Sequence, residues 1–217
     1  MIVSRGRGYV FVHIPKTGGT ALALALEARA MADDILIGDT PKARRRRRRI
    51  KGVAARGRLW KHARLADAEG LITRDEMAGL FVFTLVRNPW DRMVSYYHWL
   101  RAQAFDHRAV TLARRLDFAD FLSHAHTARS LRASPYGRYV QDPDGVERAD
   151  LFIRLEHLDT DIAPLEAHLG FRLAPLERAN ASVRARDWRG YYTDAAAERV
   201  ATLCAADIAR FGYGFDG

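Results

Sequence analysis

Short apolar runs alternate with longer amphipathic segments along the chain, and this alternation predicts strands and helices in turn. Tyr9–His13 (YVFVH) predicts a buried strand, the turn-rich Ile14–Thr20 (IPKTGGT) follows it, and Ala21–Met31 predicts a helix. A second unit of the same kind begins at Leu80–Val86 (LFVFTLV), the clearest strand of the sequence. Strands alternating with helices predict an α/β fold with a central, mostly parallel sheet flanked by helices.

The rest of the chain is expected to be largely helical. Thr73–Gly79 predicts a short helix that Thr73 caps together with Glu76, and Pro89 suits the first turn of a helix that runs from Trp90 to Gln103. Further helices are expected at Asp117–Ala128, at Asp159–Leu169 with Gly170 at its end, and at Thr193–Phe211 with Thr193 as cap. Asp144-Gly145 predicts a hairpin between Tyr139-Val140 and Leu151–Arg154. With 217 residues and no internal repeat, we expect a single domain spanning residues 1–217.

One basic segment departs from this pattern. Residues 39–58 contain six consecutive arginines, Arg44–Arg49, and no core face can be drawn through them. We therefore expect a solvated insertion there, either a loop or an irregular basic helix. The formal net charge of +9 favours an anionic partner, which could be a nucleic acid, a membrane surface, a nucleotide or an acidic glycan.

Cysteine usage and hydropathy suggest where the chain works. Cys204 is the single cysteine, so no internal disulfide can form, and we expect it to be a buried core residue on a helix. No signal peptide is recognisable, and no apolar stretch reaches membrane-spanning length. These observations predict a cytoplasmic protein without a transmembrane segment.

The loop after the first strand combines the residues of an anion site. The following helix begins with unpaired N–H groups and a partial positive charge. Gly18 and Gly19 let the backbone approach a phosphate, Thr17 and Thr20 supply hydroxyls, and Lys16 supplies a mobile cation. A tight turn with a surface lysine is the simpler interpretation, but this combination of residues disfavours it. The lysine precedes the glycines, which is not the Walker A order and weakens a nucleotide kinase reading.

A second candidate phosphate site begins where the second strand ends. Arg87 directly follows that strand, at the position where open α/β sheets bind ligands. Ser95 lies eight residues later, about two turns into the next helix, so both side chains could converge on one phosphate. The spacing alone fits equally well an arginine paired with a carboxylate and a serine that faces solvent.

Taken together, Ile14–Thr20 and Phe83–Tyr97 (FTLVRNPWDRMVSYY) resemble the sulfotransferases, in particular the bacterial group related to Golgi carbohydrate (heparan-type) sulfotransferases. Weaker similarities are FIRLEHL at Phe152–Leu158, the Asn180-Ala181-Ser182 segment, and the tail from Tyr191 to Tyr213. The resemblance implies a P-loop-like domain that transfers a sulfuryl group from 3′-phosphoadenosine-5′-phosphosulfate (PAPS) to an acceptor hydroxyl without a metal. The arginine run is not part of the family pattern, and it leaves the acceptor open.

The resemblance also implies roles for individual residues. The loop residues Lys16, Thr17, Gly18, Gly19 and Thr20 would bind the 5′-phosphosulfate, and Arg87 with Ser95 would bind the 3′-phosphate. Lys16 would also offset charge on the leaving oxygen, which makes it a catalytic residue. His62, in Trp60-Lys61-His62-Ala63, resembles the catalytic histidine of the carbohydrate group, with His13 as second candidate for the general base. Arg184 would contact the 3′-phosphate or the adenosine.

Two other classes of protein remain alternatives. A P-loop nucleotide kinase-like enzyme would also use strand–loop–helix phosphate sites. A nucleic-acid-binding module would explain Arg44–Arg49, although clustered arginines without interleaved aromatics give only unspecific phosphate affinity. The resemblance implies an acceptor on a carbohydrate. The arginine run is either a solvated loop without a specific role or a segment that recruits an anionic glycan through bidentate contacts with sulfate or carboxylate. No specific nucleic-acid partner is expected.

Overall fold

The chain folds into two compact units. The computed structural model describes residues 1–173, 175–176, 184–185 and 187–216. The sheet unit comprises Met1–Val86 and Tyr136–Ala179, and the helical unit comprises Arg87–Pro135 and Asn180–Gly217. A single domain over residues 1–217 stays a prediction, and the Asn180-Ala181-Ser182 segment lies outside the described residues.

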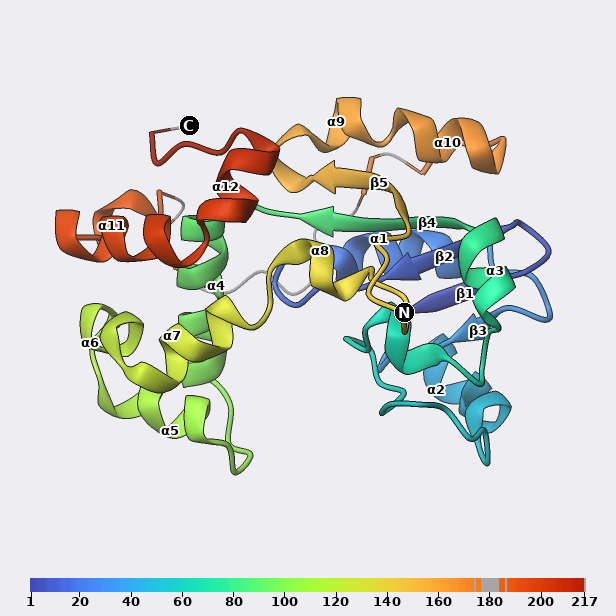
Figure 1. Ribbon diagram of the computed structural model, residues 1–217, viewed down its shortest axis with the longest axis horizontal. Helices are drawn as coiled ribbons and strands as arrows, with labels where there is room; N and C mark the ends of the chain where they lie inside the picture. Colours follow the sequence, from blue (N-terminus) through green and yellow to red (C-terminus); the bar gives the residue numbers. More distant parts are fainter. Residues whose placement is uncertain (174, 177–183, 186, 217) are drawn as a thin grey trace. The chain divides into compact units, whose positions relative to one another are not determined.

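A five-stranded sheet forms the centre of the sheet unit, in the order β3-β1-β2-β4-β5 (Figure 1). The strands are β1 (Ile2–Ser4), β2 (Tyr9–Val12), β3 (Ile35–Leu36), β4 (Phe81–Val86) and β5 (Ala149–Arg154). The pairs β2–β4 and β4–β5 are parallel, whereas β1 is antiparallel to both β2 and β3. Four of the five strands therefore run in one direction, and the predicted α/β class with a mostly parallel sheet is confirmed. The two-residue β3 and the three-residue β1 were not predicted.

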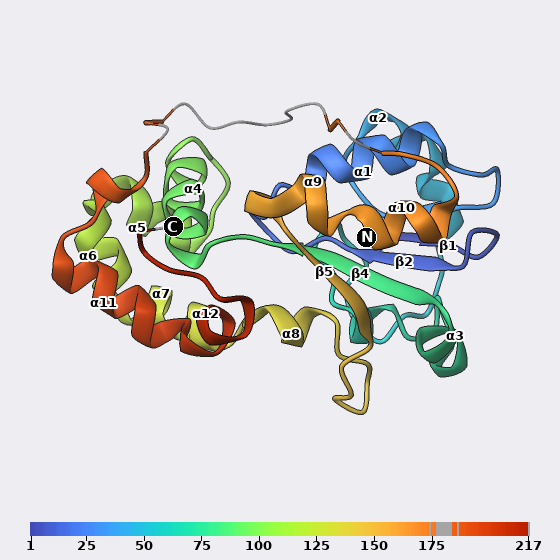
Figure 2. The same ribbon diagram turned by 90° about the horizontal axis from the view of Figure 1, so that it is seen from above.

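Helices cover both faces of this sheet. On one face lie α1 (Gly19–Ala28), α9 (Leu158–Asp161) and α10 (Ala163–Leu169), and on the other lie α3 (Arg74–Gly79) and α8 (Tyr136–Tyr139) (Figure 2). The remaining elements of this unit are α2 (Pro41–Arg46) and the 3₁₀ turns η1 (Arg47–Ile50), η2 (Leu65–Ala68) and η3 (Leu155–His157). Phe11 and Phe83 stack at 5.4 Å between their ring centroids, and the buried side chains of α1 and α10 pack into the same core.

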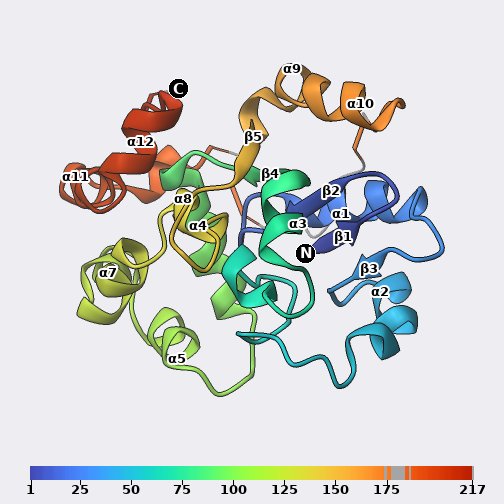
Figure 3. The same ribbon diagram turned by 45° about the vertical axis from the view of Figure 1, so that its right-hand side comes forward.

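The helical unit is built around α4 (Pro89–Arg101). Its other elements are α5 (Arg108–Arg115), α6 (Phe118–Ser123), α7 (Ala125–Arg132), η4 (Arg189–Tyr191), α11 (Asp194–Leu203) and α12 (Ala205–Phe211). Figure 3 labels α5, α7, α11 and α12 among them. Trp90 is buried in this unit. Its indole N–H donates to the Ala197 carbonyl at 2.9 Å, and its own carbonyl accepts from the Tyr192 hydroxyl at 2.8 Å, so it connects α4 to the C-terminal elements.

Several local predictions are confirmed. Thr73 caps α3 in a capping box with Glu76, and Thr193 accepts a hydrogen bond from the Ala196 N–H at the start of α11. Gly170 ends α10 in the left-handed conformation, with φ of 73°. The arginine run Arg44–Arg49 is helical, because Thr40 caps α2 and Pro41 opens it and η1 continues to Ile50, whereas residues 51–58 form no helix.

Three predicted helices are each divided in two. His124 leaves helical geometry with ψ of 133° and caps α7 by accepting from the His126 N–H. Pro164 lies in the first turn of α10, which separates it from α9. Cys204 is half-buried at the junction of α11 and α12, with φ of −115°, so it does not lie inside a continuous helix.

The predicted hairpin is also wrong. Gly145 does turn the chain, with φ of 83°, but only a single antiparallel bridge, Gln141–Glu147, follows from it. Tyr139 belongs to α8, and β5 pairs in parallel with β4 instead.

None of the described helices is long and apolar enough to span a lipid bilayer, and the described residues hold no cluster of three or more His, Cys, Asp or Glu side chains suited to a metal ion.

Candidate functional site

The loop between β2 and α1 holds two residues in the left-handed backbone conformation. Gly18 has φ of 83° and caps α1, and Lys16 has φ of 67°. Glycine adopts this conformation at little cost, whereas a non-glycine residue such as lysine loses about 1–3 kcal/mol. Strain of this kind concentrates at ligand-binding loops, so the backbone at Lys16 is consistent with a binding role for the loop.

Both glycines of the loop lie close to neighbouring side chains. A Cβ atom on Gly19 would lie 2.4 Å from Cδ2 of His13, and one on Gly18 would lie 2.7 Å from Cδ1 of Leu155. Gly19 therefore lets the His13 ring rest against the first turn of α1. The first N–H groups of this ten-residue helix have no intrahelical partner, which makes its N-terminus suited to an anion.

The two threonines of the loop are placed differently. Thr17 is fully buried, and its hydroxyl donates to the carbonyl of Ile14 at 2.9 Å, so this side chain braces the loop. Thr20 is partly exposed and lines a small cavity of about 20 Å³ together with His13, Asp39 and Lys61. Of the two predicted hydroxyl donors, Thr20 is thus the one whose side chain faces a cavity.

A contact between two histidines sets the tautomer of the candidate base. Nδ1 of His62 lies 2.9 Å from the carbonyl oxygen of His13, and the two rings meet edge to face at 4.7 Å. A carbonyl oxygen only accepts, so Nδ1 carries the hydrogen and the neutral ring keeps its lone pair on Nε2. His62 is therefore prepared to accept a proton at Nε2, which is what a general base requires.

The surroundings keep both histidines neutral. Burial lowers the pKa of His62 to about 4, although the hydrogen bond to the His13 carbonyl opposes this change. Lys61 and the N-terminal ammonium lower this pKa further, and Asp39 raises it. Burial, followed by the charge of His62, also holds the pKa of His13 well below its ordinary value. Lys61 pairs with Asp39 at 2.6 Å, beside His62 in the chain.

The helical unit gathers the other predicted binding residues around Asp91. Arg87 contacts Oδ2 of Asp91 through Nε at 2.8 Å and Nη2 at 2.5 Å, and Arg184 contacts Oδ1 through Nη2 at 2.5 Å. One carboxylate shared by two guanidinium groups leaves a net charge of +1. Nη1 of Arg184 is buried and has no hydrogen-bond partner within the described part of the chain. Ser95 is buried one helical turn beyond Asp91, on the same side of α4.

Sequence reasoning missed Asp91, although its spacing from Arg87 was a usable signal. The two residues are four positions apart at the start of a predicted helix, which places them side by side. The carboxylate partner considered as the alternative for Arg87 thus exists, and the same carboxylate brings Arg184 to Arg87. The Arg87–Asp91 ion pair therefore agrees with the alternative interpretation of Arg87, and Asp91 also holds the two arginines side by side.

Comparisons with known proteins find likenesses among the solved structures but not among sequence families. No family model and no curated protein matches the sequence. A crystal structure of the mouse sulfotransferase SULT7A1 complexed with PAP is similar over 93% of this chain and 84% of that chain, with 17% sequence identity and a TM-score of 0.48. At this level of similarity the function has to be argued from the residues themselves.

Proposed function

We propose that this chain is an enzyme that transfers a sulfuryl group from PAPS to an acceptor hydroxyl. The observation that carries the proposal is the arrangement of the sheet unit, where a glycine loop at a helix N-terminus follows directly on the residue whose carbonyl orients a neutral histidine. The loop suits a phosphosulfate group, and His62 suits the removal of a proton from a hydroxyl.

The residues that would hold the donor fit its anionic groups. In the sheet unit, Lys16, the loop backbone and Thr20 would contact the 5′-phosphosulfate. In the helical unit, Ser95 and the two arginines on Asp91 would contact the 3′-phosphate. Nη1 of Arg184, which has no hydrogen-bond partner among the described residues, is a donor suited to an anion. β2 and β4 end at the same edge of the sheet, and Arg87 is the residue that follows β4.

The proposed reaction requires one proton transfer and one in-line displacement. The acceptor hydroxyl gives its proton to Nε2 of His62, and its oxygen forms a bond to sulfur. The bond between sulfur and the 5′-phosphate oxygen breaks, and adenosine 3′,5′-bisphosphate (PAP) leaves with the electron pair. The Lys16 ammonium offsets the charge that develops on that oxygen, so positioning and electrostatics supply most of the rate.

The acceptor is proposed to be a carbohydrate hydroxyl. This choice of acceptor is supported by the resemblance of the segment around His62 to the carbohydrate sulfotransferases. The chemistry needs no metal ion, because the loop, Lys16 and the arginines supply the positive charge.

Calorimetry with PAP and AMP tests the donor assignment. AMP lacks the 3′-phosphate, so we expect PAP to bind about 10- to 100-fold more tightly. Arg184→Gln should abolish most of this difference, whereas Arg115→Gln, which removes the same charge from an exposed position on α5, should leave it unchanged. Equal affinities for PAP and AMP in the unmodified protein would overturn the roles of Arg87, Ser95 and Arg184. Tighter binding of Mg²⁺–ATP than of PAP would favour a nucleotide kinase instead.

A further inference from the structure

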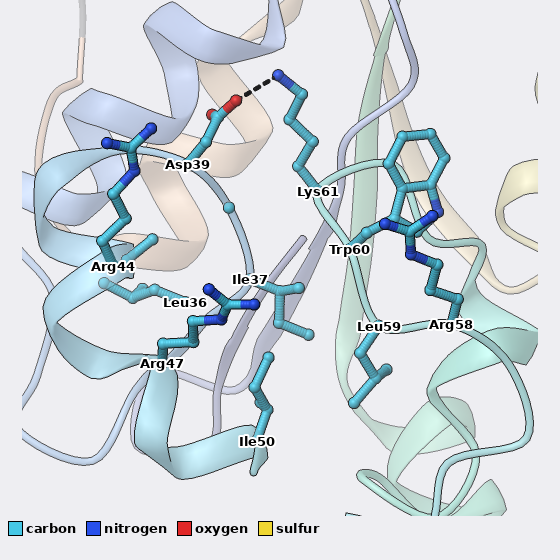
Figure 4. Close-up of a pocket in the computed structure, with 12 residues that line it drawn as sticks. Leu36, Ile37, Asp39, Arg44, Arg47, Ile50, Arg58, Leu59, Trp60 and Lys61 are labelled. Carbon is cyan, nitrogen blue, oxygen red and sulfur yellow. Dashed lines mark hydrogen bonds and ion pairs between the residues drawn. The ribbon is translucent and has the colours of Figure 1, made fainter. Parts of the chain in front are cut away.

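A second cavity of the sheet unit is lined by cations, among them Lys61, the residue before the candidate base. Its volume is about 440 Å³, within the usual range for small-ligand pockets (Figure 4). Its apolar side chains are Leu36, Ile37, Ile50 and Leu59, and its charged side chains are Arg44, Arg47, Arg58, Lys61 and Asp39. Four cations and one carboxylate give a net charge of +3 around one hollow, which favours an anion there.

The helical geometry of the arginine run sorts its six members into three pairs. Residues three apart lie on the same side of a helix, and Arg44 and Arg47 both line the cavity. Arg46 and Arg49 instead bind backbone, because Nη1 of each donates to the Asp34 carbonyl, at 3.3 and 2.6 Å respectively.

The third pair, Arg45 and Arg48, is exposed, as Arg44 and Arg47 are, but it does not line the cavity. The run is therefore not a uniform charged patch. One pair faces the cavity, one pair anchors α2 and η1 to the preceding loop, and one pair faces solvent.

The opposite wall of the cavity supplies an aromatic ring and two more cations. Arg44 and Arg47 extend from the α2 side, and Arg58, Trp60 and Lys61 extend from the facing segment (Figure 4). The Trp60 side chain is 43% exposed, which is unusual for a large aromatic residue, and the Arg58 guanidinium lies 5.8 Å from its ring centroid. An exposed indole beside arginines offers a flat apolar surface next to anion-binding groups.

We propose that this cavity is the acceptor site and that it takes a sugar ring bearing a sulfate or carboxylate group. Arg44, Arg47 and Arg58 bind the anion, since a guanidinium pairs bidentately with either group. Trp60 packs against the C–H face of the ring. The cavity wall ends at Lys61, the residue before His62, so a hydroxyl of the bound sugar is delivered toward the base. The assignment as acceptor site rests on the proposed sulfuryl transfer, whereas the binding of the anionic sugar does not.

Two double variants of equal charge test the site. Arg44→Gln/Arg47→Gln removes the pair that lines the cavity, and Arg45→Gln/Arg48→Gln removes the exposed pair of the same segment. The probe is a uronate-containing, sulfated disaccharide, titrated calorimetrically at low and moderate salt, with its desulfated, carboxyl-reduced counterpart as the neutral reference. We expect the first variant to bind the anionic disaccharide about tenfold more weakly or worse, and the second to remain within about twofold of the unmodified protein.

Trp60→Leu adds a test that does not depend on charge. It should weaken the binding of the anionic disaccharide while the dependence on salt stays the same. PAP affinity, measured in every variant, reports whether the fold and the donor site are intact.

The outcomes separate this proposal from the proposed function. An equal loss of disaccharide binding in both double variants would overturn the assignment of the cavity as the sugar site. If PAP still binds to these variants, the proposed sulfuryl transfer is not contradicted. Absence of disaccharide binding to the unmodified protein, or tighter binding of a single-stranded oligonucleotide than of the disaccharide, would also overturn it. Disaccharide binding with the expected pattern but no PAP binding would support the cavity as a sugar site and contradict the donor assignment.

Discussion

Nδ1 of His62 donates to the carbonyl oxygen of His13 across 2.9 Å, and this contact connects the candidate base to the candidate phosphate loop. His13 is the residue that follows β2, and Lys16 lies three positions further on. The orientation of the imidazole is therefore set by the same backbone that enters the loop. A change in the path of that backbone would alter both the base and the loop.

Replacement of His62 by asparagine separates this orienting contact from the chemistry. The asparagine amide can still donate to the His13 carbonyl, but it has no Nε2 to accept a proton. We expect His62→Asn to lower kcat by about 100- to 10,000-fold with PAP affinity nearly unchanged. Steady-state turnover and PAP calorimetry are the measurements. If His62→Asn is active and His13→Ala shows this loss instead, His13 is the base.

The pH dependence of turnover follows from the low pKa of His62. With a pKa of about 4, the ring is neutral and able to accept a proton throughout the range from pH 5 to 7.5. We expect kcat/KM to stay level over this range and to bend downward only near pH 4. A unit-slope decline that begins at pH 6.5 would contradict the buried, neutral state of His62.

Stability should depend on pH for the same reason. Unfolding returns the His62 pKa from about 4 to its ordinary value near 6.5, so between these values the unfolded chain binds more protons than the folded chain. Above pH 6.5 neither the folded nor the unfolded chain protonates this residue, so the free energy of unfolding is unaffected by it. As the pH falls toward 4, the unfolded chain takes up the proton first and the free energy of unfolding decreases. Urea unfolding at pH 7.5 and pH 5 should show a loss of up to about 2 kcal/mol from this residue. His62→Asn should lose less between the two pH values, and an equal loss in both proteins would contradict the assignment.

Lys16→Gly is expected to separate the strain of the loop from its charge. Glycine relieves the left-handed backbone, where φ is 67°, and removes the ammonium group. We expect the free energy of unfolding to stay equal or to rise by up to about 1 kcal/mol. Turnover should nevertheless fall by about 100- to 1,000-fold, because one preorganised charge is lost. Lys16→Ala is the matched variant that keeps the strain, and full turnover in either variant would rule out the catalytic role of Lys16.

The close contact under the His13 ring predicts the effect of a single methyl group. Gly19→Ala places a Cβ atom 2.4 Å from Cδ2 of His13, so the ring has to move, at a cost of about 1–3 kcal/mol. Thermal unfolding should shift downward by roughly 2–10 °C for a chain of this size. Gly79→Ala is the control, since among the described residues no atom beyond its chain neighbours and its own helix lies within 4 Å of the added Cβ, and the position is helical. Equal melting temperatures for the two variants would show that the ring is free to move.

The local parts of the fold and of the site could be predicted from the sequence. The strand, loop and helix around Lys16, and the strand that ends before Arg87, depend on residues that are neighbours in the chain, where apolar runs, glycines and capping residues act directly. The breaks at His124 and Cys204 were missed, because both lie within sequences of sustained helical pattern and neither residue is a strong helix breaker.

Long-range contacts could not be predicted in the same way. His62 meets His13 across 49 positions, and Arg184 meets Asp91 across 93 positions. Neither separation leaves a periodic trace in the sequence. The division of the six arginines into three pairs depends on the helix that Thr40 caps. In a loop, residues three positions apart would not lie on the same side, so the sequence alone could not predict these pairs.

The half-buried thiol at the junction of α11 and α12 makes this chain convenient for site-specific labelling. Burial raises the pKa of Cys204 to about 11, so the reactive thiolate is scarce at neutral pH. A maleimide dye would therefore react far faster with a cysteine introduced on an exposed position such as Arg45 than with the native thiol. Fluorescence from that position would report on changes around the arginine run of α2 and η1 in an otherwise unmodified protein.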